Sequence, residues 1–307
     1  MSRFIKRLLS GAAALCLTAG LTGCVSRLPQ GGTNSDAGGS SSTAASDGET
    51  AGTEAPGTDK ESLARFVRKA AQNSPGAMAL NAEVDVQVTM RGDWGSVGYR
   101  YQGPLLTDSR EGINRLYEYR EYSFWTGQGS RYSYQNQYED YLCYYDSSWI
   151  YQNNNGKKSK EPYQYAGFLT HRTQTAAPLV VPSRLVVSAE AESAGGTHRI
   201  RLQLNPHDLG DTLGFLRDEY GDKGERAEII SLELEVLIGP DGCYRSQTLT
   251  VNANGRQTFG ESAGLGSQED VSYTAIYAAS YAPQDKEVVI TPPDNLDTYR
   301  IEDRDEI

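Results

Sequence analysis

The chain has 307 residues, of which 40 are acidic and 29 basic, and its formal net charge is −11. Nucleic acid and anionic lipid headgroups are also negatively charged, so the composition argues against both as partners. The charge suits a soluble extracytoplasmic domain instead.

Residues 1–23 indicate a secretory signal peptide. Three basic residues near the start precede an apolar run that is too short for a comfortable membrane span. The run ends in "LTGC", residues 21–24, which resembles the bacterial lipobox, in which a peptidase cuts before a diacylated cysteine. We therefore expect Cys24 to be the lipidated first residue of the mature chain. The alternative is an ordinary signal peptide followed by an unrelated cysteine.

Lipidation at Cys24 would hold the protein on the extracytoplasmic face of the cell membrane without spanning it, since two or more acyl chains give durable attachment. Cleavage removes three basic residues and no acid, which takes the formal charge from −11 to −14. Residues 24–58 are rich in Gly, Ser, Thr and Ala and predict a disordered tether. A flexible segment of this length reaches roughly 30–35 Å.

The folded part is expected to begin with a helix. In "DKESLARFVRKAAQNSPG" the residues Leu63, Phe66, Val67 and Ala70 form one apolar stripe, and Pro-Gly ends the pattern. The period then changes, because apolar and polar residues alternate without a break through residues 80–91. This alternation predicts an antiparallel strand with one buried and one solvated face.

Further strands are expected at short intervals as far as "KEVVITPP". Among them, "IISLELEVLIG" and "CYRSQTLTVN" flank "PDG", which predicts a hairpin. One leucine-rich helix is expected in "NPHDLGDTLGFLRDEYG", where Leu209, Leu213 and Leu216 recur at helical spacing. The prediction is a single α+β domain over residues 59–300, followed by an acidic tail, 301–307.

The order of these elements resembles the lipoprotein half-barrel superfamily, which includes the LolA/LolB-like and LppX/LprG-like carriers. The matching features are the lipobox and tether, the opening helix, the strand "NAEVDVQVTM", the aromatic strands ending in "YYDSSWIYQ", the leucine helix and the "PDG" hairpin. The resemblance implies a single curved antiparallel β-sheet, a half-barrel, with helices covering its concave face. It also implies an apolar cleft for acyl chains or a lipidated client.

No motif for a metal site is apparent, and the search for catalytic motifs gives one match. The chain lacks S-x-x-K and H-E-x-x-H and has no Cys/His cluster, while "GESAG", residues 260–264, matches G-x-S-x-G; a short motif alone does not establish a nucleophile. His198 lies on the same strand face as Ile200 and Leu202, which favours a core position over catalysis. We therefore expect a protein that is not an enzyme and uses no cofactor or metal. Cys143 and Cys243 remain in the mature domain, either as a disulfide or as two buried thiols.

The stretch "YLCYYDSSWIY", residues 141–151, concentrates aromatic side chains. Strand alternation places Tyr141, Cys143 and Tyr145 on one face and Leu142 and Tyr144 on the other, so the stretch is explained first by β-propensity, with "DSS" as a turn. The candidate ligand-binding residues, taken from these strands and the leucine helix, are Tyr141, Tyr145, Trp149, Tyr151, Leu213 and Leu216.

These observations lead to one functional hypothesis with an alternative. The first is a membrane-anchored, non-catalytic extracytoplasmic lipoprotein that binds or carries a lipid or another hydrophobic ligand. The alternative is a structural lipoprotein that contacts another envelope protein or a glycan through the surface of its sheet. A hollow core favours the first, and a filled core favours the second.

Overall fold

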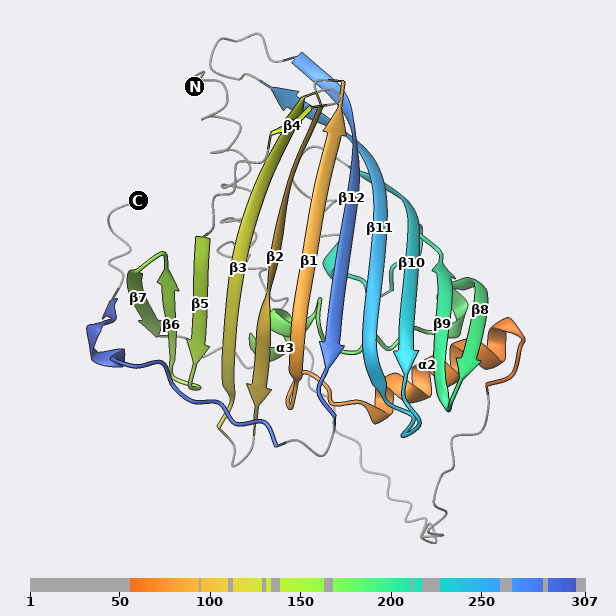
Figure 1. The fold of residues 1–307 in the computed structure, drawn as a ribbon, viewed down its shortest axis with the longest axis horizontal. Coiled ribbons are helices and arrows are strands. Elements are labelled where there is room, and N and C mark those ends of the chain that lie inside the picture. Colours follow the sequence, from red (N-terminus) through yellow and green to blue (C-terminus); the bar gives the residue numbers. More distant parts are fainter. Residues whose placement is uncertain are drawn as a thin grey trace, which may run out of the picture. The chain divides into compact units, whose positions relative to one another are not determined.

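A computed structural model of the chain has two units, of which the second is Thr53–Ile307, and Figure 1 draws the described residues of this second unit as coloured ribbons. The structure describes residues 56–93, 95–109, 113–128, 131–133, 139–162, 168–210, 212–216, 227–259, 267–283 and 287–301. The predicted signal peptide, Cys24 and nearly all of the predicted tether lie outside these ranges. No helix within them is both long and apolar enough to cross a membrane.

The described part of the second unit is built on one curved, open sheet. Its strands are β1 (Asn81–Gly92), β2 (Gly95–Asp108), β3 (Arg115–Gln128), β4 (Arg131–Ser133), β5 (Glu139–Tyr145), β6 (Trp149–Asn154), β7 (Lys157–Pro162), β8 (Val186–Ala194), β9 (Thr197–Leu204), β10 (Glu228–Ile238), β11 (Tyr244–Phe259), β12 (Ser267–Tyr281) and β13 (Arg300–Ile301). Their order is β13-β7-β6-β5-β3-β2-β1-β12-β11-β10-β9-β8, with β4 paired to β3. All described pairings are antiparallel except β13 with β7.

Strand β1 shows how the alternating sequence separates the two faces of the sheet. Val84 and Val86 lie opposite Ala279 and Tyr277 of β12, and all four side chains are buried. The polar residues between them point to the opposite side. We call the face that carries Val84 the core face and the opposite one the outer face. The predicted two-sided strand is thus confirmed.

Helix α2 (Lys60–Asn73) covers one end of the core face. Asp59 caps it by accepting a hydrogen bond from the backbone N–H of Ser62 at 2.9 Å. Its buried side, which includes Leu63 and Val67, lies against β8, β9 and β10. The opening helix is confirmed. Phe66 of this helix meets the ring of His198 edge to face, with centroids 5.3 Å apart.

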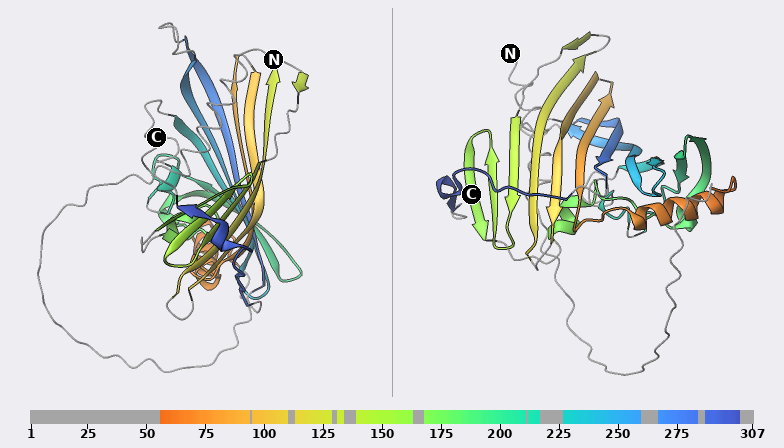
Figure 2. Two further views of the ribbon diagram at one scale, coloured as in Figure 1. Left: turned by 90° about the vertical axis from the view of Figure 1, so that its left-hand side faces the viewer. Right: turned by 60° about the horizontal axis from the view of Figure 1, so that its bottom comes forward.

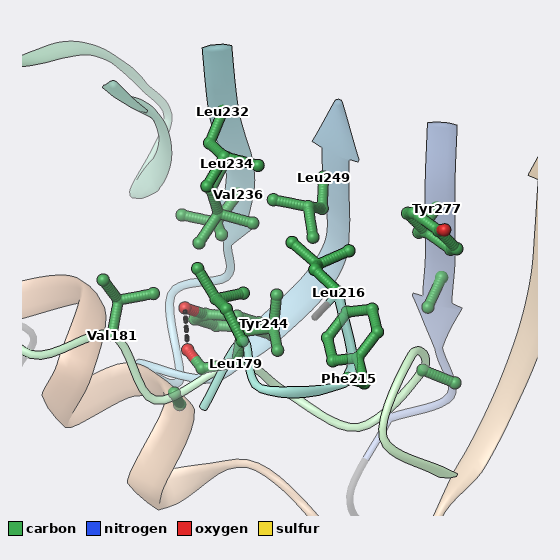
Figure 3. Close-up of a cluster of buried hydrophobic side chains, with 14 of the residues drawn as sticks. Leu179, Val181, Phe215, Leu216, Leu232, Leu234, Val236, Tyr244, Leu249 and Tyr277 are labelled. Carbon is green, nitrogen blue, oxygen red and sulfur yellow. Dashed lines mark hydrogen bonds between the residues drawn. The ribbon is translucent and has the colours of Figure 1, made fainter. Parts of the chain in front are cut away.

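Other segments also lie over the core face, and together with α2 we call them the cover. Their described residues are mostly irregular. They contain the short helix α3 (Phe168–Thr173) and the 3₁₀ turn η2 (Ser183–Leu185). Side chains of the sheet hold the chain between them by hydrogen bonds to its backbone. Tyr281 donates to the carbonyl of Ala176 at 2.7 Å, and Tyr244 donates to the carbonyl of Leu179 at 3.3 Å. Figure 3 shows the second of these bonds.

The predicted leucine helix differs from the structure. Most of residues 205–214 form turns, helical conformation appears at 215–216, and 217–226 lie outside the described residues. Local turn chemistry overrides the leucine spacing here: Asp208 accepts a hydrogen bond from the N–H of Gly210, and Gly210 has a φ of 55°. The expected layer of helices over the concave face is therefore not what the described residues show. On the core face, α2 is accompanied by the short helix α3, the 3₁₀ turn η2, and turns and extended segments.

The hairpin between β5 and β6 follows the predicted "DSS" turn. The carboxylate of Asp146 accepts hydrogen bonds from the N–H groups of Ser148 and Trp149 at 3.0 and 2.9 Å. Ser147 has a φ of 75°, which turns the chain between the strands. The "PDG" turn between β10 and β11 is confirmed in the same way, with Gly242 at a φ of 74°.

A smaller cluster lies on the outer face at the other end of the sheet. The rings of Tyr144 and Tyr151 have centroids 5.8 Å apart, and Tyr299 packs edge to face on Tyr151 at 5.5 Å. Ile290 and Leu296 pack against the same cluster. The C-terminal segment is thus fixed by aromatic packing, and it ends in β13 beside β7 (Figures 1 and 2). Residues 302–307 of the predicted acidic tail lie outside the described residues.

Candidate functional site

The six residues proposed from sequence do not meet at one place. Tyr141 and Tyr145 lie on the core face of β5, whereas Trp149 and Tyr151 lie on the outer face of β6 and belong to the cluster around Tyr299. The alternation expected for "YLCYY" is confirmed, because Tyr144 is opposite Tyr151 on the outer face. Both faces of this strand pair are thus lined by aromatic side chains.

Leu213 and Leu216 lie in the interior. Both are 0 % exposed, and Figure 3 shows Leu216 among residues of the cover and of β10, β11 and β12. Phe215 beside it packs edge to face on Tyr277 with centroids 5.9 Å apart. Side chains therefore fill this part of the core face, and by the criterion set from sequence this finding favours the structural alternative over a ligand carrier.

Among the described residues, the cover extends over only part of the length of the strands. On β1, Ala82, Val84 and Val86 are buried, but the next two core-face residues, Val88 and Met90, are only half-buried. These two apolar side chains lie opposite Tyr99 and Val97 of β2. An apolar part of the core face is therefore accessible beyond the filled part.

An aromatic strip extends from there across β2 and β3. We use this name for Tyr99, Tyr101, Tyr122 and Phe124. Tyr101 and Tyr122 have ring centroids 5.3 Å apart, and the rings of Tyr122 and Phe124 are stacked with centroids 6.1 Å apart. The three tyrosines are half-buried. Together with Val88 and Met90 the strip provides a largely apolar surface that also carries tyrosine hydroxyl groups.

A buried ionic cluster adjoins the strip. Glu118 of β3 is bound by two arginines, which we call the arginine pair. Its Oε1 accepts hydrogen bonds from Arg120 at 2.5 Å, and its Oε2 accepts one from Nη2 of Arg172 in α3. Nη1 of Arg120 also donates to the hydroxyl of Tyr122 at 3.0 Å, and Nη2 of Arg172 donates to that of Tyr141 at 3.2 Å.

Aromatic rings flank the arginine pair. The guanidinium carbon of Arg120 lies 4.5 Å from the ring centroid of Tyr101 and 5.7 Å from that of Tyr141. That of Arg172 lies 5.9 Å from the ring of Tyr141. These are cation–π distances. The rings keep the guanidinium groups of both arginines at the edge of the aromatic strip.

Glu118 remains ionised in this setting. Burial alone would raise the pKa of its carboxyl group, but the charges and hydrogen bonds of Arg120 and Arg172 outweigh burial and hold that pKa below its usual range. Burial also raises the pKa of the neighbouring Cys143 thiol. A neutral, buried thiol is a poor nucleophile.

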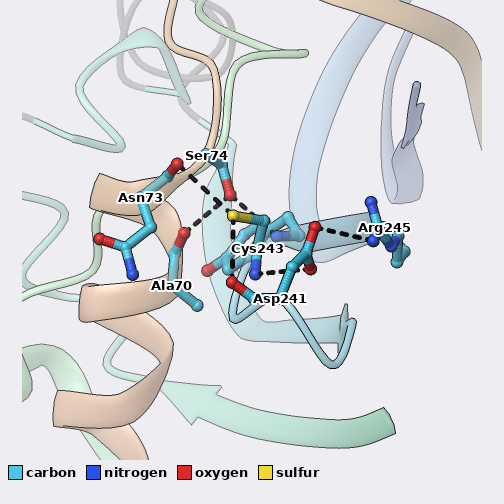
Figure 4. Close-up of polar contacts among 7 residues, drawn as sticks. Ala70, Asn73, Ser74, Asp241, Cys243 and Arg245 are labelled. Atoms are coloured by element: carbon cyan, nitrogen blue, oxygen red, sulfur yellow. Dashed lines mark hydrogen bonds and ion pairs between the residues drawn. The ribbon is translucent and has the colours of Figure 1, made fainter. Parts of the chain in front are cut away.

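Cys143 and Cys243 are not joined by a disulfide. Cys143 lies on the core face of β5, and Cys243 precedes β11, with four strands between β5 and β11 in the sheet. Strands are spaced roughly 4.8 Å apart, so the two residues are far beyond the roughly 6 Å between Cα atoms that a disulfide spans. The structure therefore excludes the disulfide and leaves the alternative of two buried thiols. Cys243 contacts the carbonyl of Asn73 (Figure 4).

Two open depressions elsewhere are polar. One, of about 310 Å³, lies on the outer face of β8–β10 and is lined by Ser188, Glu190, Arg201, Gln203, Glu233 and Glu235. The other, of about 650 Å³, is lined by ends of β1, β10, β11 and β12. Neither has the lining of an apolar cleft. In the described ranges, no three His, Cys, Asp or Glu side chains gather as a metal site requires.

Sequence reasoning missed the arginine pair. Glu118 and Arg120 alternate in step with Leu116 and Phe124, so all four lie on the same face of β3, and Leu116 and Phe124 are buried. Charged residues on the apolar face of an alternating strand were the available signal. Arg172 lies in a short helix distant in sequence, and nothing in its local sequence indicates that it reaches Glu118.

Comparisons with known proteins gave matches among solved structures alone. No family model matches the chain, and no curated protein is similar to it in sequence. Among solved structures, the crystal structure of LprF from Mycobacterium bovis matches 78 % of this chain and 99 % of its own, at 8 % identity and a TM-score of 0.33. With so low an identity and TM-score, the likeness adds nothing to what the sheet itself says about function.

Proposed function

We propose that this protein is a membrane-anchored, non-catalytic extracytoplasmic lipoprotein that binds a lipid or another hydrophobic ligand on the uncovered part of its core face. One observation carries the proposal. Along β1 the core-face residues change from buried at Val86 to half-buried at Val88 and Met90, although all are apolar. An acyl chain can remove such an apolar surface from water, and the filled core beside it does not need to rearrange.

The site residues follow from this surface. Val88, Met90 and the aromatic strip would contact the apolar part of the ligand, and Tyr141 would lie at its edge. Tyr145, Leu213 and Leu216 would support the site from within the core. Trp149 and Tyr151 lie on the outer face and would take no part. Cys24 would carry the lipid anchor.

The proposal is tested with a matched pair of substitutions on β1. Met90 lies on the core face and Thr89 on the outer face. Met90→Asp introduces a charge where an acyl chain would lie and is expected to weaken binding of a fluorescent acyl probe by about tenfold or more. Thr89→Asp should leave the affinity unchanged. Equal probe binding by both variants, or no binding by the unmodified protein, would refute the proposed site.

A second function is favoured by the edge of the sheet. Strand β8 is the last strand in the sheet order, it has nine residues, and most of them are exposed. An exposed edge strand can pair with a strand of another protein. On this alternative the molecule would be a structural lipoprotein that contacts another envelope protein through β8. A chemical cross-link from β8 to a partner, together with absence of acyl-probe binding, would favour it over the first.

A further inference from the structure

We propose that the arginine pair is the headgroup subsite of the hydrophobic ligand and that the ligand therefore carries an anionic head, a carboxylate or a phosphate. The inference rests on the proposed function and extends it from an apolar ligand to an acidic amphiphile. Its apolar part would lie on the aromatic strip, and its head would contact Arg120 and Arg172.

The charge balance of the cluster supports an anion. Two guanidinium groups surround one carboxylate, so the group carries an excess of one positive charge in a chain whose formal net charge is −11. A mostly buried charge without compensation costs free energy. A single negative charge on a ligand would complete the balance.

One donor of the cluster is unused. Nε of Arg172 is buried and has no hydrogen-bond acceptor among the described residues, while Nη2 of the same guanidinium is bound to Glu118 and Tyr141. A buried donor without an acceptor is uncommon in folded proteins. Carboxylates and phosphates match the fork of donors that an arginine presents.

The arginines are the part of the cluster that solvent can reach. The side chains of Arg120 and Arg172 are 19 % and 13 % exposed, whereas that of Glu118 is 5 % exposed. The two arginine side chains are thus more accessible to a ligand than the side chain of Glu118. Arg120 stacks on Tyr101 of the strip itself. Head and tail would therefore bind to adjoining surfaces.

Matched probes separate this inference from the proposed function. The mature chain with Cys24→Ser, which has no acyl chain of its own, is titrated with two pairs of fluorescent probes: a long-chain fatty acid and its methyl ester, and a lysophosphatidic acid and the corresponding monoacylglycerol. We expect the anionic member of at least one pair to bind about tenfold more tightly than its neutral partner. The pair with the larger difference tells whether the head is a carboxylate or a phosphate.

Variants assign the preference to the arginine pair. Arg172→Gln leaves one guanidinium group beside one carboxylate, so the excess positive charge is lost. This variant should no longer prefer the anionic probe, and its affinity for the neutral probe should be unchanged. Arg172→Lys keeps the charge and should retain part of the preference. The control is Arg100→Gln on the outer face of β2, where Arg100 pairs with Asp85, and it should change neither affinity.

Each outcome is decisive. If anionic and neutral probes bind unmodified protein equally, or if the preference survives Arg172→Gln, the cluster is a structural ion triad and the inference is wrong, although the proposed function stands. If no probe binds, the proposed function fails and the headgroup site fails with it. If Arg172→Gln does not fold, Arg172→Lys decides, since an unchanged affinity for both probes in that variant would contradict a guanidinium-specific site.

Discussion

At the scale of single residues, one buried polar side chain, Gln247, ties the irregular segment over the core face to the sheet. Gln247 is 1 % exposed. Its side-chain amide donates to the carbonyl of Ala177 and accepts from the N–H of Leu179, both at 3.0 Å. An irregular segment over a sheet would otherwise bury backbone groups without partners. Glu118 has a different role, because it neutralises arginines that lie beside an accessible surface.

The ionisation of Glu118 makes one prediction about stability. The pKa of Glu118 is lower in the folded state than in the unfolded chain, so the ionised carboxylate stabilises the fold. This stabilisation is fully present above the unfolded-state pKa of about 4.3. It is lost as the pH falls through the folded-state pKa. Glu118→Gln should therefore lower the free energy of unfolding at neutral pH by roughly 3 kcal/mol, because two mostly buried guanidinium groups lose their carboxylate.

The pH dependence is the specific readout. The difference in free energy of unfolding between Glu118→Gln and the unmodified protein should shrink as the pH is lowered below about 4, as measured by urea denaturation at a series of pH values. Glu83→Gln on the outer face of β1 is the control, with little effect at any pH. A Glu118→Gln difference that is constant with pH would mean that the carboxylate's charge does not stabilise the fold.

At the scale of elements, the junction between α2 and β11 fixes the helix against the sheet. Ser74 follows the last residue of α2, and its hydroxyl donates to the carbonyl of Ala70 at 2.7 Å. The same oxygen accepts from the N–H of Tyr244 at 2.8 Å. Cys243 lies in the same group of contacts (Figure 4). One buried hydroxyl thus satisfies a backbone group at the end of the helix and another at the start of the strand.

Removal of that hydroxyl should be costly. Ser74→Ala leaves the N–H of Tyr244 without its acceptor, and a buried unsatisfied group costs about 1–3 kcal/mol. We expect a loss of that size in the free energy of unfolding, measured by urea denaturation. The matched control is Ser272→Ala, since Ser272 is exposed on β12, and it should change the value little. Equal stability of the two variants would show that the junction does not hold the helix.

At the scale of the whole molecule, the alternating strands, the opening helix and the hairpins were predictable from sequence because they rest on local periodicity and turn chemistry. The cover was not. Leu209, Leu213 and Leu216 have helical spacing, yet the described part of their segment is mostly turns, because Asp208 and Gly210 determine the local backbone. The arginine pair escaped prediction for a related reason: Glu118 and Arg172 are 54 positions apart, and only the fold brings them together.

The predicted cell-envelope location rests on residues 1–24, which the structure does not describe. If Cys24 carries the lipid, Cys24→Ser should release the protein from the membrane fraction, because the acyl chains supply the attachment. Cys16→Ser alters the one cysteine within the predicted signal peptide and should leave the protein in that fraction. Immunoblots of membrane and soluble fractions, with mass spectrometry of the N-terminal peptide, measure both. A Cys24→Ser protein that stays with the membrane would show that another contact holds it there.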